Sequence, residues 1–181
     1  MRNLTKLIAL LITSASLSTT ASDLKKIHVE NGLDYSIPIS SPVRFATIDR
    51  NSVAFFRGRF VMSGTYHYGY VSSFPNADLE LYFIPDKASA DRLPYWAERG
   101  HVHEIWFTNQ DAFVREVIPS AEVVNLKSKR TLSVSGKVEI VAEYYQASVE
   151  CDYPDYAVSF VTASQRGYEL ATNALVEEYG C

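Results

Sequence analysis

Apolar and polar residues alternate over several short stretches of the chain, and this alternation is typical of half-buried β-strands. The expected strands lie at 52–62, 65–71, 79–83, 102–107, 131–145 and 156–163. Gly64 separates the first two, and Pro75 with Asn76 supplies a turn before the third. Before the first strand, Pro38 and Pro42 favour an extended arm.

Helical features interrupt this strand pattern at three places. A helix is expected within 86–100, where Ser89 gives a start signal, Pro94 restricts the helix to a segment that begins near it, and Gly100 ends it. Asn109 can cap a second helix that runs to Val117. A closing amphipathic helix over 167–179 is predicted by residues at helical spacing, namely Tyr168, Ala171, Leu175 and Tyr179. The fold class is therefore α+β, as a β-rich antiparallel sheet or small barrel with two or three short helices.

The first residues follow the order of a secretory signal peptide. Arg2 and Lys6 precede a short apolar stretch, and Thr19 and Ala21 are the small residues expected before a cleavage site. We therefore expect residues 1–21 to be removed and the remainder to act in the periplasm or the medium. The apolar stretch is much shorter than the roughly 20 residues that cross a bilayer. No other segment approaches that length, so no membrane span is expected in the mature chain.

Residues 22–181 have the length and composition of one globular domain, since 47% of the whole chain is apolar and 21% is charged. Two short stretches, 56–60 and 134–138, each place a basic residue after a glycine, and they predict two related β units at about 45–107 and 108–181. The formal charge of -4 becomes -6 when the two basic residues of the leader are removed. A chain of this sign is a poor partner for nucleic acid.

The chain contains two cysteines, Cys151 and Cys181. In an oxidising compartment the pair predicts one disulfide, which would close a loop of about 30 residues and contribute about 3 to 4 kcal/mol. The alternative is a reactive thiol at Cys151. The negative charges of Glu150 and Asp152 oppose that alternative because they disfavour the thiolate.

Tyrosine residues are the main candidates for a contact surface. Tyr66, Tyr68 and Tyr70 share one face if their segment is a strand, and such a row can bind a protein or stack on sugars. The alternative is that these rings pack against a neighbouring element. Tyr144 and Tyr153 lie near several acids and can contact a cationic or glycan partner. The alternative for this second group is a hairpin whose loop is anchored by the disulfide.

His101 and His103 are the candidate metal ligands, because two histidines on one strand face can bind zinc or copper when a third ligand is supplied. His67 and Asp78 are candidates for that third ligand. The alternative is a solvent-facing edge near a turn.

No nucleophile elbow, glycine-rich phosphate loop or His-Glu-x-x-His motif occurs in the sequence, and no cofactor is expected. These observations favour an exported binding or inhibitor-type protein that contacts a protein partner through an aromatic surface. A cell-envelope hydrolase and a module that binds cell-envelope glycan are the alternatives.

Overall fold

The computed structural model describes residues 24–28, 34–70, 79–98, 100–150, 153–166 and 169–171. The strands are β1 (Leu24–His28), β2 (Asp34–Pro38), β3 (Arg44–Ile48), β4 (Ala54–Arg57), β5 (Arg59–Tyr70), β6 (Leu79–Pro85), β7 (Tyr95–Trp96), β8 (Ile105–Phe107), β9 (Ser133–Glu150), β10 (Tyr153–Arg166) and β11 (Glu169–Ala171). The helices are α1 (Lys87–Ala90), α2 (Gln110–Val117) and α3 (Ser120–Lys127). This content confirms the β-rich α+β class. None of the described helices has both the length and the apolarity needed to cross a bilayer.

The larger sheet closes into a ring of five strands, in the order β5, β6, β8, β10 and β9. The neighbours pair antiparallel, except for β8 and β10, which are parallel. Outside the ring, β4 and then β3 continue the sheet from β9. A smaller sheet consists of β1, β2 and β7. In the ring, β5, β6 and β8 come from the first predicted β unit and β10 and β9 from the second, and residues of both units contribute to one hydrophobic core.

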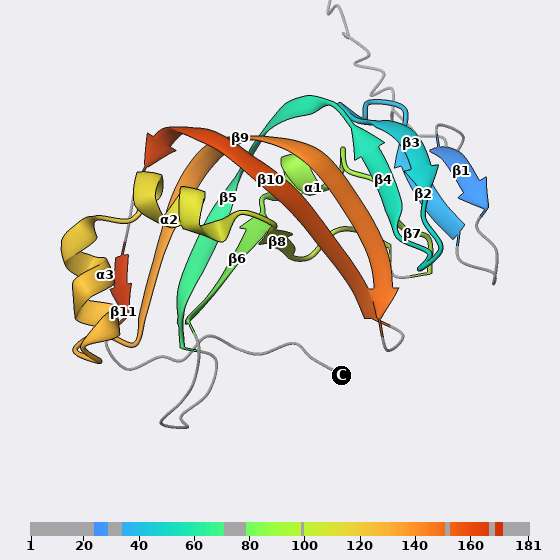
Figure 1. Cartoon of the computed structure of the whole chain (residues 1–181). Helices are drawn as coiled ribbons and strands as arrows, with labels where there is room; N and C mark the ends of the chain where they lie inside the picture. The colour runs from blue at the N-terminus through green and yellow to red at the C-terminus, as the bar shows by residue number, and fades with distance from the viewer. Residues whose placement is uncertain are drawn as a thin grey trace, which may run out of the picture.

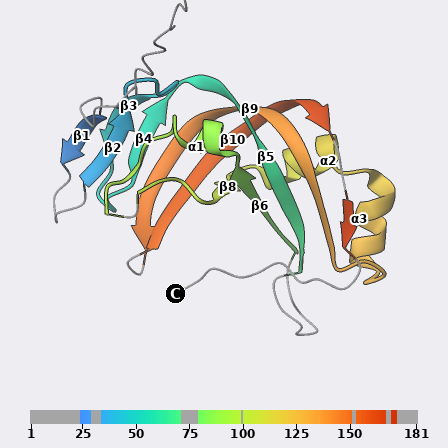
Figure 2. The same ribbon diagram turned by 180° about the vertical axis from the view of Figure 1, so that it is seen from behind.

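The long strands β9 and β10 arch over the molecule, with α2 and α3 at one end of the arch and the smaller sheet at the other (Figure 1). The view from behind shows β5 crossing in front of β9 and running beside β6 in its lower part (Figure 2). The two views place α2 against the ring of strands, where it contributes to the core.

The core next to α2 is aromatic. Phe113 of α2 is fully buried, and its ring centroid lies 4.8 Å from that of Phe107, 5.2 Å from that of Phe160 and 5.4 Å from that of Tyr66. These partners come from β8, β10 and β5. One helical side chain therefore contacts three strands of the ring.

A second part of the core joins the smaller sheet to the ring through buried tyrosines. The Tyr145 hydroxyl donates to the backbone oxygen of Pro94 at 2.6 Å, and the backbone N–H of Trp96 donates to the Tyr156 hydroxyl at 3.0 Å. Burial raises the pKa of Tyr145 well above its ordinary value, so its phenol remains protonated. The smaller sheet is thus attached by hydrogen bonds as well as by apolar packing.

The first long strand bends at Gly58 and not at Gly64. Gly58 has φ 145°, and a Cβ there would lie 2.8 Å from the backbone oxygen of Pro42. Gly64 lies inside β5, where an added Cβ would overlap the backbone oxygen of Ile84 on β6. Gly64 therefore allows β5 and β6 to approach each other closely. It does not separate the two strands expected at 52–62 and 65–71, because it lies inside β5.

The helical predictions have mixed outcomes. The expected helix near Pro94 is wrong, because that segment forms β7 and the helix lies earlier, at α1, where Asp86 Oδ1 accepts a 2.8 Å bond from the Ser89 N–H. The prediction also missed α3, which follows Pro119 directly. Within the predicted helix 167–179 the structure describes only Glu169–Ala171, which form a strand, so the closing helix is not confirmed.

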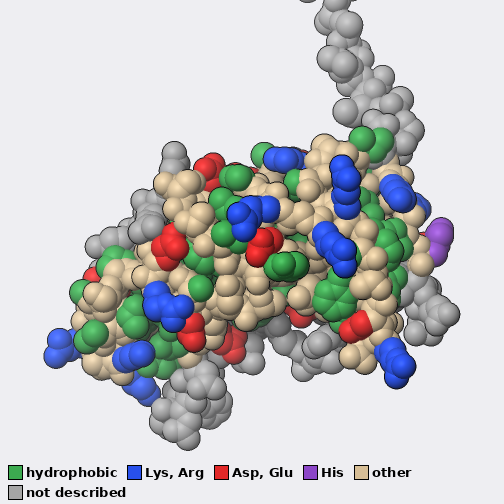
Figure 3. Space-filling model, turned by 45° about the horizontal axis from the view of Figure 1, so that its top comes forward, with side chains coloured by type: hydrophobic (Ala, Val, Ile, Leu, Met, Phe, Trp, Pro, Cys, Tyr) green, Lys and Arg blue, Asp and Glu red, His purple; other side chains and the backbone are tan. Residues whose placement is uncertain are grey.

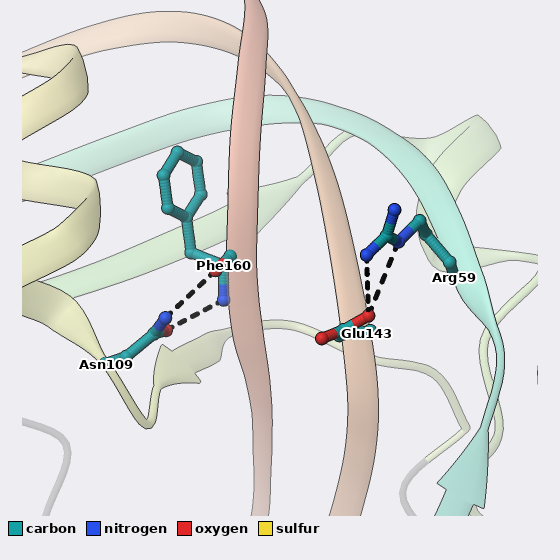
Figure 4. Close-up of polar contacts among 4 residues, drawn as sticks. All are labelled: Arg59, Asn109, Glu143 and Phe160. Carbon is teal, nitrogen blue, oxygen red and sulfur yellow. Dashed lines mark hydrogen bonds and ion pairs between the residues drawn. The ribbon is translucent and has the colours of Figure 1, made fainter.

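The helix α2 is confirmed, and Asn109 precedes it as predicted. However, the Asn109 side chain does not cap the helix. Its Nδ2 donates to the backbone oxygen of Phe160 at 2.9 Å, and its Oδ1 accepts from the Phe160 N–H at 2.8 Å (Figure 4). The amide therefore pairs with β10 as a strand residue would.

Asn109→Ala should lower the free energy of unfolding by about 1 kcal/mol, because it removes two hydrogen bonds from partly buried backbone groups. Urea denaturation followed by circular dichroism measures this. The exposed neighbour Gln110 provides the control, and Gln110→Ala should change stability by less than about 0.5 kcal/mol. Equal stability of the two variants would contradict the role assigned to Asn109.

Candidate functional site

The three tyrosines predicted to form an exposed row are buried. The exposed fractions of Tyr66, Tyr68 and Tyr70 are 0%, 8% and 8%. Their shared face is the interior face of β5, where the Tyr70 hydroxyl donates to the backbone oxygen of Leu126 at 3.1 Å. The three rings share one face, as expected, but a contact with a partner through this face is wrong, because the rings fill the core; the alternative, packing against a neighbouring element, is confirmed.

The opposite, outward face of the ring carries a second set of rings. His67, Tyr82 and Trp106 lie side by side on β5, β6 and β8 in direct register. The His67 and Tyr82 rings stack at 5.0 Å with an interplanar angle of 15°, and the Tyr82 and Trp106 rings lie 6.3 Å apart. Tyr82 is nearly buried, whereas its two neighbours are half-buried. Burial lowers the pKa of His67, which favours its neutral form.

Three carboxyl groups accompany this row on the outward face. Glu80 lies on β6, Glu104 precedes β8, and Asp155 lies on β10; all three are half-buried. Burial raises the pKa of Glu104 from 4.5 to about 7, with smaller contributions from the charges of Asp155 and Glu80. Glu104 therefore exchanges a proton near neutral pH. We call the six residues of the row and this acid group the aromatic–acidic face.

The sequence predicts only part of the aromatic–acidic face. Alternation placed Glu104 and Trp106 on one side of an expected strand. The acids Glu80 and Asp155 come from distant segments, and pairing of β8 with β6 and β10 brings them together. The alternation of residues within one segment does not indicate which residues of distant segments will lie beside it.

His101 and His103 lie together, as expected for a pair on one side of an extended segment. Their ring centroids are 4.1 Å apart, and both side chains are exposed. Burial and the neighbouring His101 lower the pKa of His103. Among the described residues, no group of three or more His, Cys, Asp or Glu side chains is placed to hold a metal ion. His67 belongs to the aromatic row, and Asp78 lies outside the described residues, so metal binding stays a prediction.

The remaining predicted residues have different outcomes. Tyr144 is 60% exposed on β9, in contrast to its buried neighbour Tyr145. Tyr153 lies at the start of β10, but its side chain is outside the described part of the structure, as are Cys151 and Cys181. The disulfide therefore stays a prediction.

The aromatic–acidic face combines two kinds of binding group. Aromatic rings provide apolar contact area and attract cations, and ionised carboxylates form charge-assisted hydrogen bonds with basic groups. No protein-family model, curated protein or solved structure shows a significant match to this chain.

Proposed function

We propose that this chain is an exported binding protein that holds a basic segment of a protein partner on its aromatic–acidic face. The observation that carries the proposal is the placement of an aromatic row and three carboxyl groups on one outward face of the ring. This surface replaces the buried tyrosines as the contact region.

The connectivity of the ring supports this location. In chain order the ring strands are β5, β6, β8, β9 and β10, and α2 and α3 lie between the third and the fourth. This five-strand barrel resembles OB-fold barrels, which bind oligonucleotides and oligosaccharides on the face of their second and third strands. Here those strands are β6 and β8, which carry much of the aromatic–acidic face. Because a fold does not determine a function, the likeness supports only where a ligand would bind.

Charge supports the class of partner. The carboxyl groups of Glu80, Glu104 and Asp155 disfavour a polyanionic ligand such as nucleic acid. A lysine or arginine side chain can contact the Trp106 ring and form an ion pair with a carboxylate at the same time. A bound cation would also favour the ionised form of Glu104, since an opposite charge lowers the pKa of a carboxyl group.

Titration of the protein with an oligolysine peptide at pH 8 tests this proposal. The wild-type chain should bind the peptide, and Trp106→Ala and Glu104→Gln should each weaken binding by about 10-fold, equivalent to about 1.4 kcal/mol. Isothermal titration calorimetry measures the affinities. Val124→Ser, an exposed site on α3, should leave the affinity unchanged. Absence of binding, or equal affinity in all variants, would contradict the proposal.

A cell-envelope hydrolase is the second candidate function, and the Glu104 pKa near 7 favours it. Glycoside hydrolases use a pair of carboxyl groups, and Asp155 is the carboxyl group whose charge acts most strongly on Glu104. Incubation with peptidoglycan or chitin oligosaccharides separates the possibilities. New reducing ends that disappear in Glu104→Gln would favour a hydrolase, whereas saccharide binding without cleavage would favour a glycan-binding module.

A further inference from the structure

Two arginines face each other on the strand pair at the edge of the larger sheet. Arg44 of β3 and Arg57 of β4 are direct cross-strand partners, and both side chains are exposed. Neither forms an ion pair with an acidic side chain of the described residues. Like charges placed opposite each other repel. An anion bound between the two guanidinium groups would remove that repulsion.

A third arginine lies on the same side of the continuous β4–β5 strand. Arg59 follows Arg57 by two residues, and its Nε and Nη2 donate to Glu143 Oε2 at 3.3 Å and 3.2 Å (Figure 4). Three arginines and one glutamate leave a local formal charge of +2, although the whole chain carries -4. Lys and Arg side chains also gather on the side of the molecule that holds β3 and β4 (Figure 3).

The edge strands hold these arginines on a fixed base. Phe45 packs against Phe56 with ring centroids 5.9 Å apart, and Phe56 packs against buried Tyr145 at 5.6 Å. Phe56 and Tyr145 are buried in the core, whereas Phe45 is 38% exposed at the sheet edge, and the arginines occupy the alternate strand positions. The bend at Gly58 then leads directly into β5.

A β-bulge adds an exposed ring beside the arginines. Between the pairs Ser159↔Glu143 and Ala157↔Gln146, two residues of β9 lie opposite one residue of β10. The first of the two, Tyr144, has φ 55°, which is uncommon for a bulky residue. Such bulges re-aim side chains, and strained residues concentrate at functional sites. Here the bulge exposes Tyr144 and buries Tyr145.

We propose that Arg44, Arg57, Arg59 and Tyr144 form a second binding site, for a saccharide that carries carboxylate groups. A guanidinium group binds a carboxylate through two parallel hydrogen bonds, and a tyrosine ring packs against the apolar face of a sugar. A uronic acid unit offers the oxyanion and the ring-shaped body together. The site is separate from the aromatic–acidic face and has the opposite charge.

Titration with trigalacturonate at 50 mM salt tests the site, with neutral maltotriose as the matched ligand. The wild-type chain should prefer trigalacturonate, and Arg44→Gln/Arg57→Gln should weaken its binding by at least about 10-fold. Tyr144→Ser should weaken it by about 3-fold or more. The double variant Lys127→Gln/Arg130→Gln removes the same charge elsewhere and should keep the affinity within about 2-fold. Thermal denaturation confirms that each variant is folded.

Three results would overturn the proposal. They are equal binding of the two saccharides, unchanged affinity in the Arg44→Gln/Arg57→Gln variant, and binding to phosphatidylglycerol vesicles without binding to trigalacturonate. Glu104→Gln should leave trigalacturonate affinity unchanged, because it alters the other face. Failure of oligolysine binding with intact trigalacturonate binding would therefore reject the proposed function and retain this site.

Discussion

Phe113→Ala should lower the free energy of unfolding by about 3 to 5 kcal/mol, because it removes a fully buried ring and leaves a cavity. The ring contacts Tyr66, Phe107 and Phe160, which belong to three different strands of the ring. Relaxation of any one strand cannot fill the space without disturbing its pairing with the others. We therefore expect a cost in the upper part of the range that is measured for large-to-small substitutions.

Guanidinium denaturation followed by tryptophan fluorescence measures this loss. The variant should still fold, because α2 keeps a second attachment to β10. There, Glu116 Oε1 accepts bonds from the Thr162 hydroxyl at 2.7 Å and the Ala163 N–H at 2.9 Å. Val124→Ala on α3 is the matched control and should change stability by less than about 0.5 kcal/mol, since Val124 is exposed. A loss below about 1 kcal/mol for Phe113→Ala would show that this core is not closely packed.

The positions of several strands could be predicted from the sequence. The expected strands at 79–83, 131–145 and 156–163 correspond to β6, β9 and β10, and the helix before Val117 corresponds to α2. In β9, β10 and α2 one face is mainly buried, so the period of apolar residues appears directly in the sequence, whereas in β6 both faces are buried at 81–83. The sequence left open an antiparallel sheet or a small barrel, because closure of the ring depends on pairings such as that of β8 with β10, which are distant in sequence.

The candidate site was harder to predict for a related reason. Both faces of β5 carry residues with rings, since Tyr66 and Tyr68 alternate with His67. A tyrosine row is compatible with a core or a surface, and the packing of α2 decides between them. Likewise, nothing near Glu104 in the sequence identifies Asp155 or Glu80 as neighbours. The sheet order supplies that information.

Glu104→Gln should stabilise the protein at pH 8 and leave its stability unchanged at pH 4. Folding raises the pKa of this carboxyl group from 4.5 to about 7. At pH 4 the group is largely protonated in both states. Between pH 4.5 and 7 the unfolded chain ionises first, so stability falls as pH rises, and the full penalty is present above pH 7. Glutamine cannot ionise and avoids this penalty.

The expected gain at pH 8 is about 1 to 2 kcal/mol. Without solvent screening, the difference in the Glu104 pKa between the unfolded and folded states would correspond to about 3 kcal/mol. The side chain is partly exposed, however, and solvent weakens its interactions. The facing groups are Glu80 on β6 and Asp155 on β10, and both oppose ionisation of Glu104. The adjacent His103 has a lowered pKa, so it is mostly neutral at pH 8 and supplies little compensating charge.

Urea denaturation of the wild type and Glu104→Gln at several pH values measures the effect, in buffer that contains a chelator. Glu98→Gln, at an exposed acid, should change stability by less than about 0.5 kcal/mol at each pH. Loss of stability at pH 8 in Glu104→Gln would contradict the assigned pKa. A variant that is more stable and also binds oligolysine less tightly would indicate that the carboxyl group opposes folding and promotes binding. Such a trade-off between stability and binding is expected of a functional site. If Glu104 only repelled neighbouring acids, the variant would gain stability without any change in oligolysine binding.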